Sequence, residues 1–179
     1  MMMTRNIFRI IPLKIALISA IMLMIPTGCS ISYKLNGAAL DYSLYKTVHV
    51  GEFPIRAALV YAPLQPMFEN QLTDYIRSNT RLQVVDGRAD LDLTGEITGY
   101  TLTPQSVNEN AVAAQTRLTI TVRVKYTDHK DESKDLDQTF SAYYDFDSSY
   151  MLTDIQDQAC EDITKQLVTL IFNATLGNW

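Results

Sequence analysis

Residues that commonly catalyse reactions or bind metals are scarce in this chain, which has two histidines and two cysteines among 179 residues. His49 falls in an expected strand and His129 in a charged turn. Neither has a second ligand at a spacing such as H-x-x-x-H. The sequence also has neither a G-x-S-x-G nucleophile motif nor a phosphate-binding P-loop. We therefore expect no enzymatic activity, no cofactor and no metal site.

Four carboxylates gather in the same turn, at Asp128, Asp131, Glu132 and Asp135. Their spacing departs from D-x-D-x-D-G, the pattern that arranges oxygen ligands around calcium in an EF-hand. Basic residues, among them Lys130, also interrupt the cluster. A solvated hairpin tip is the preferred interpretation.

No apolar run reaches the roughly 20 residues that a membrane-spanning helix requires. The run at residues 15–25 follows a basic start with Arg5, Arg9 and Lys14 and precedes Pro26-Thr27-Gly28-Cys29. A basic start, a short apolar segment and a small residue before the cleavage point are typical of a secretory signal. A cysteine directly after the small residue is typical of a lipobox, in which that cysteine is acylated.

We therefore predict that residues 1–28 form a lipoprotein signal peptide and that Cys29 is the lipid anchor to a membrane. Pro26 occupies a position where such signals usually carry leucine. Two alternatives stay open: simple secretion with an accidental cysteine, and an N-terminal anchor that is never cleaved.

The predicted mature chain is acidic. Its 151 residues carry 12 basic and 20 acidic side chains, a formal net charge of −8. Generic binding to nucleic acid requires a basic face, so we expect no nucleic-acid partner. A chain of this length is long enough to form one domain with its own core.

An intramolecular disulfide is excluded once Cys29 carries lipid, because Cys160 is then the only cysteine left. Cys160 lies one position from the apolar stripe of an expected helix. A small buried residue is the preferred interpretation and a reactive thiol is the alternative.

Apolar periodicity places the secondary structure in the following order. Residues 29–45 read as a linker, and residues 46–179 read as a single domain. Strands are expected at 46–53, 82–85, 91–103, 117–127 and 136–146, and helices at 63–80 and from Thr153 onward. Thr153 and Gln156 fit a capping box. Gly99 is the expected place for a bulge and Pro104 for the end of its strand.

The fold class follows from where these elements are apolar. Strand 117–127 alternates between apolar and polar residues throughout, so one face of the sheet is buried and the other is wet. Two amphipathic helices can cover only that apolar face. We predict an α+β two-layer sandwich, with two helices packed on one face of a mostly antiparallel or mixed sheet of about four strands.

Several stretches resemble the LptE family of lipopolysaccharide-assembly lipoproteins, in its divergent Bacteroidota-type branch. The similarity spans essentially the whole mature chain. The matching residues are Gly28-Cys29, Phe53-Pro54, residues 68–72, residues 95–100, Thr103-Pro104, residues 113–122, Lys125-Tyr126, residues 145–148, residues 171–173 and Trp179.

The resemblance implies a lipid-anchored protein on the periplasmic face of the outer membrane. Such proteins plug a large LptD-type β-barrel, assist its assembly and help to insert lipopolysaccharide into the outer leaflet. After Cys29 the chain runs Ser30-Ile31-Ser32-Tyr33 without an acidic run, which favours the periplasmic side. The alternatives are another periplasm-facing lipoprotein that activates or scaffolds an envelope enzyme or secretion complex, and a free-standing lipid-binding or hydrolytic domain.

Three basic residues on the wet face of the cleanest strand, Arg117, Arg123 and Lys125, are candidates for binding lipopolysaccharide. Side chains two residues apart on a strand project the same way, and such cations form charge-assisted hydrogen bonds with phosphate. The alternative is cross-strand pairing with Asp137 or Asp145, which contributes little for each pair.

Overall fold

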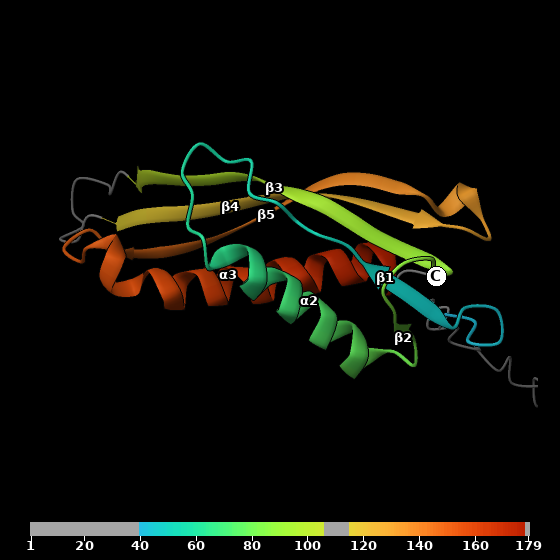
Figure 1. Ribbon diagram of the computed structural model, residues 1–179. Coiled ribbons are helices and arrows are strands. Elements are labelled where there is room, and N and C mark those ends of the chain that lie inside the picture. Colours follow the sequence, from blue (N-terminus) through green and yellow to red (C-terminus); the bar gives the residue numbers. More distant parts are fainter. Residues whose placement is uncertain (1–39, 106–114, 178–179) are drawn as a thin grey trace, which may run out of the picture. The chain divides into compact units, whose positions relative to one another are not determined.

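The computed structural model describes residues 40–105 and 115–177 (Figure 1). Contacts divide the chain into residues 1–35 and 36–179, and every described residue belongs to the second unit. The predicted signal peptide, Cys29 and most of the predicted linker lie outside the described residues, as do residues 106–114.

A five-stranded mixed sheet with the order β2-β1-β3-β4-β5 forms one layer of the fold. The long strands β3 (Leu91–Gln105), β4 (Gln115–Asp128) and β5 (Leu136–Asp147) pair antiparallel. The short β1 (Thr47–Val50) pairs parallel with both β3 and β2 (Gln83–Val84). The predicted fold class is confirmed, with five strands instead of about four. The two-residue strand β2 lies within the strand expected at residues 82–85.

Strand β3 contains the predicted irregularity. Its register against β4 shifts between Ile97 and Gly99, so Thr98 is the extra residue of a bulge. A Cβ atom on Gly99 would lie 2.9 Å from the Cβ atom of Thr121, so the strands approach too closely there for a larger residue.

The prediction that Pro104 ends this strand is wrong, because β3 continues to Gln105 and Pro104 pairs in register with Thr116. Strand β1 reaches only as far as Leu93 along the other side of β3. Pro104 therefore lies on a free edge, where a missing N–H costs no ladder hydrogen bond.

Two helices form the second layer on the apolar face of the sheet (Figure 1). Helix α2 (Leu64–Asn79) buries Leu64, Phe68, Leu72 and Ile76, as its spacing predicts. Helix α3 (Leu152–Thr175) packs against β5, β4 and α2.

The capping box predicted at the start of α3 is wrong. The helix begins at Leu152, one residue before Thr153, and the N-cap residue Met151 makes no side-chain capping hydrogen bond. Gln156 instead donates from Nε2 to the phenol oxygen of Tyr100, at 2.7 Å. This contact turns the side chain of Gln156 toward β3.

The core lies between the layers. On β4, the inward side chains Leu118, Ile120, Val122, Val124 and Tyr126 are at most 1% exposed. From α3 they meet Ala159, Cys160, Ile163, Leu167, Val168 and Ile171, which are equally buried. Complete burial of a leucine or isoleucine contributes about 1.5–3 kcal/mol relative to exposure.

Two carboxylates hold the segment that leads into β1. The side chain of Asp128 is fully buried at the end of β4 and accepts a 2.7 Å hydrogen bond from the phenol of Tyr45. Asp128 also accepts the backbone amides of Lys130 and Asp131, which closes the β4–β5 turn. Leu40 and Tyr45, in the predicted linker, are buried against the domain.

Asp90 is the second of these carboxylates. Its Oδ2 atom accepts the backbone amides of Lys46 and Thr47, at 2.8 and 3.1 Å. Its Oδ1 atom lies 3.0 Å from the ammonium group of Lys130. The hydrogen bond from Lys46 is the main cause that lowers the pKa of Asp90 from 3.8 to about 2, and the nearby Lys130 cation adds to it.

This pKa shift predicts acid sensitivity. Because the folded-state pKa lies below the unfolded value, the stabilisation from Asp90 is present above about pH 4 and is lost as the pH falls toward 2. We expect D90N to lower the free energy of unfolding at pH 7 by about 1–3 kcal/mol. Between pH 5 and pH 2, the wild type should lose about 2 kcal/mol more than D90N.

Urea unfolding at both pH values measures the effect. D74N, which removes an exposed carboxylate from α2, is the matched control. Identical acid profiles for D90N and the wild type would contradict the assignment.

Candidate binding face

The face of the sheet that points away from the helices is polar and rich in hydroxyl groups. Along the middle of this wet face, Thr121 on β4 and Ser141 on β5 lie opposite each other with their hydroxyl oxygens 2.9 Å apart. Thr119 next to them pairs in register with Thr101 and Tyr143. Ion pairs lie on either side of this band.

Arg123 and Lys125 lie together on the wet face, as the sequence predicts. The guanidinium group of Arg123 makes two parallel hydrogen bonds of 2.8 Å to the carboxylate of Asp137 on β5. This pairing lowers the pKa of Asp137. Both side chains are about half exposed, so the pair contributes at most about 1 kcal/mol to stability.

A shallow pocket of about 280 Å³ surrounds this pair. It is lined by Thr94, Gly95, Glu96, Arg123, Lys125 and Asp137. Lys125 lies between Thr94 and Asp137 in the strand register, and it has no carboxylate within 4 Å among the described residues. The pocket therefore offers one ammonium group that no ion pair occupies, beside a guanidinium group already held in place.

Arg117 belongs to a separate cluster near the other end of β4. Its guanidinium group makes two hydrogen bonds of 2.7 Å to Asp145 and stacks 3.6 Å from the ring centre of Tyr143. Six residues along a strand separate it from Arg123, about 20 Å. The three predicted cations therefore form two sites, and two of the three make the cross-strand pairs that the sequence left as the alternative.

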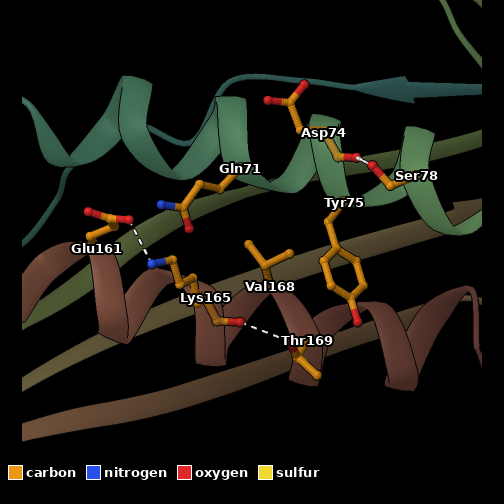
Figure 2. Close-up of a pocket in the computed structure, with 8 residues that line it drawn as sticks. All are labelled: Gln71, Asp74, Tyr75, Ser78, Glu161, Lys165, Val168 and Thr169. Carbon is orange, nitrogen blue, oxygen red and sulfur yellow. Dashed lines mark hydrogen bonds and ion pairs between the residues drawn. The ribbon is translucent and has the colours of Figure 1, made fainter.

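A groove of about 440 Å³ runs between the two helices on the side away from the sheet (Figure 2). Helix α2 contributes Gln71, Asp74, Tyr75 and Ser78, and α3 contributes Glu161, Lys165, Val168 and Thr169. The Nζ atom of Lys165 lies 2.6 Å from Glu161, and this hydrogen bond raises the pKa of Lys165. Lys165 is thus a paired cation in this groove and not a free amine nucleophile.

Cys160 is completely buried in α3, which confirms the preferred interpretation of this residue. Its Sγ atom lies 3.9 Å from the phenol oxygen of Tyr100. Burial raises the pKa of the Cys160 thiol to about 11. The thiolate that reacts with electrophiles is therefore suppressed near neutral pH.

The structure gives His129 a partner that sequence spacing does not reveal. Its Nε2 atom lies 2.6 Å from the carboxylate of Asp92, which is 37 residues away in the chain. The antiparallel pairing of β3 with β4 brings the two residues together. Within residues 40–105 and 115–177, no three histidine, cysteine or carboxylate side chains are grouped closely enough to hold a metal ion.

Neither described helix combines the length and the apolar character that are needed to span a membrane. The sheet, the helices on one face and the wet opposite face define a two-layer α+β sandwich with an open sheet. The chain belongs to the LptE family of lipopolysaccharide-assembly proteins, because the model of that family matches residues 45–175. The resemblance seen in the sequence is thereby confirmed, and family membership assigns the chain to lipopolysaccharide assembly.

Solved structures with low sequence identity also align with the chain. A minor lipoprotein from Acinetobacter baumannii is 16% identical, with a TM-score of 0.47 over 71% of this chain and 89% of its own. Rare lipoprotein B from Shewanella oneidensis is 13% identical, with a TM-score of 0.44 over 70% and 92%. PelC from Paraburkholderia phytofirmans, a dodecamer, is 11% identical, with a TM-score of 0.43 over 78% and 94%. A comparison with curated proteins finds no match.

Proposed function

We propose that this protein is the lipoprotein partner of an LptD-type β-barrel. In this role it sits at the periplasmic face of the outer membrane, plugs the barrel, assists its assembly and helps to insert lipopolysaccharide into the outer leaflet. The observation that carries the proposal is the family match at residues 45–175. The matched range includes every strand and both helices of the described domain.

The proposed role is binding without catalysis. The chemistry of the described side chains supports this, since Cys160 is buried and the guanidinium groups of Arg117 and Arg123 are held by carboxylates.

The proposed anchor is lipid on Cys29, with residues 1–28 removed. Cys29 lies eleven residues before Leu40, which is buried in the domain. A stretch of that length can span at most about 38 Å. Asp90 and Asp128 fix the point where this stretch joins the domain, so the lipid would keep the sandwich close to the membrane surface.

We further propose that Arg123 and Lys125 contact the phosphates of lipopolysaccharide, with Arg117 as a second contact. Lys125 would supply an ammonium group that has no carboxylate within 4 Å among the described residues, and Arg123 would share its guanidinium group between Asp137 and a phosphate. Charge-assisted hydrogen bonds of this kind are stronger than neutral ones.

Co-purification tests the proposed partnership. The full-length protein, extracted from the outer membrane in mild detergent, should bring down one large barrel whose gel mobility shifts on heating. A soluble enzyme as the main partner would favour the scaffold alternative. Recovery of neither would reject the proposed role as barrel partner.

Charge reversal tests the proposed phosphate contact. We expect R123E/K125E to weaken lipopolysaccharide binding by about tenfold or more, because it replaces two attractions by two repulsions. R77E/K165E reverses two equally exposed cations on the helices and is the matched control. Binding of labelled lipopolysaccharide and thermal unfolding are measured on the same samples.

Both variants should stay folded, because exposed ion pairs contribute at most about 1 kcal/mol each. If R123E/K125E fails to fold, R123Q/K125Q replaces it. Unchanged binding in a folded variant would remove these residues from the proposed site.

Replacement of Cys29 tests the proposed anchor. We expect C29A to leave the outer membrane fraction, because the acyl chains that hold the protein there can no longer be attached. The variant should unfold at the same temperature as the wild type, since the core lies within the described domain. Membrane fractionation and thermal unfolding are the measurements. Retention of C29A in the outer membrane would contradict lipid anchoring through this residue.

A further inference from the structure

The three long strands have two outer edges, and these edges differ in how far other parts of the chain cover them. Strand β1 covers β3 at residues 91–93, and the loop after β1 continues the cover, since Ile97 bonds through its backbone to Pro54 and Arg56. Farther along, Pro104 interrupts the row of donors on the same edge. This edge is therefore partly paired and partly blocked, as is usual for edges that avoid unwanted strand pairing.

Strand β5 forms the other edge of the sheet and has none of these protections. It is 12 residues long, keeps a regular register with β4 throughout, and contains no proline, glycine, lysine or arginine. Its charges are aspartates near the ends, and residues 138–144 are uncharged. No other strand pairs with its outer side among the described residues.

The backbone hydrogen bonds of β3, at the opposite edge of the long strands, determine which N–H and C=O groups of β5 point outward. The N–H and C=O groups of Ile97 bond away from β4, so the facing Val122 must bond to the other side, to Phe140 on β5. Residues alternate, so the backbone groups of Thr139, Ser141 and Tyr143 point outward. The carbonyl oxygen of Tyr143 accordingly meets only a long 3.5 Å contact, from Gln166 of α3.

An open edge of this length invites the addition of another strand. A second copy of this chain is a poor occupant. When β5 pairs antiparallel with a copy of itself, residues whose backbone groups point outward must lie opposite one another. Of the registers that meet this condition, the two with the longest overlap place Asp137 opposite Asp145 in one and opposite Asp147 in the other. Carboxylates directly opposite each other destabilise a strand pair. The charge pattern thus favours a different chain with basic residues near the ends of its strand.

We propose that the outer edge of β5 is a docking site for an extended segment of the barrel partner. This inference rests on the proposed function and adds the surface through which the two proteins meet. The segment would not be one of the strands that form the barrel wall, because strands in a closed barrel have their backbone groups paired already. It would bond to Thr139, Ser141 and Tyr143, be uncharged at its centre, and carry lysine or arginine opposite the aspartates.

A proline on the edge tests the proposal. S141P removes an outward N–H and places a ring in the path of an added strand, yet it breaks no backbone hydrogen bond between β5 and β4. S141A is the matched control, since it loses the same hydroxyl contact to Thr121 and keeps the N–H. We expect S141P to lower recovery of the barrel with the full-length protein at least tenfold and S141A to change it less than twofold.

Thermal unfolding of each purified variant shows whether the fold is kept, and T139P replaces S141P if it is not. Equal recovery of the barrel by folded S141P and S141A would overturn the proposal. If the wild type itself recovers no barrel, the proposed function fails first, so the two failures are distinguishable.

A photo-crosslinking residue in place of Tyr143, whose side chain is 49% exposed, identifies the neighbour of β5 in cells. An adduct with the barrel protein supports the proposal. A crosslinked dimer of this chain, or an internal crosslink to residues 30–39, would assign the edge to a different occupant and overturn it.

Discussion

The apolar inner face of β4 is the constraint on which the rest of the structure depends. Its five inward side chains, from Leu118 to Tyr126, are almost completely buried, and its backbone pairs with β3 on one side and β5 on the other. Because side chains alternate, burial of one set leaves Arg117, Arg123 and Lys125 on the opposite face. The same alternation that forms the core therefore creates the polar face proposed to bind lipopolysaccharide.

Elements with a strong local pattern could be predicted from the sequence. The alternation of β4 and the four-three spacing of α2 each indicate both the type of element and its buried face. Predictions from local sequence patterns were wrong where a residue's place in the tertiary structure decided its role. Pro104 is tolerated because it lies on an edge, and Gln156 turns from helix capping to the phenol of Tyr100.

The candidate site was predictable only in part, for the same reason. Arg123 and Lys125 are two residues apart, so their shared face follows from the strand alone. Tyr45 and Asp128, by contrast, are 83 residues apart, and His129 lies 37 residues from Asp92. No local spacing reports such contacts, because they depend on strand order and on the path of the chain around the sheet.

The hydrogen bond between Tyr45 and Asp128 has a mechanical consequence. If the lipid on Cys29 holds the protein against flow or thermal motion, tension travels along the chain to Tyr45 before it reaches β1. Strand β1 is only four residues long and would separate easily if pulled alone. The buried carboxylate directs the load to the end of β4, the central strand of the three longest. Tension on the anchor would then be shared by the best-paired part of the sheet.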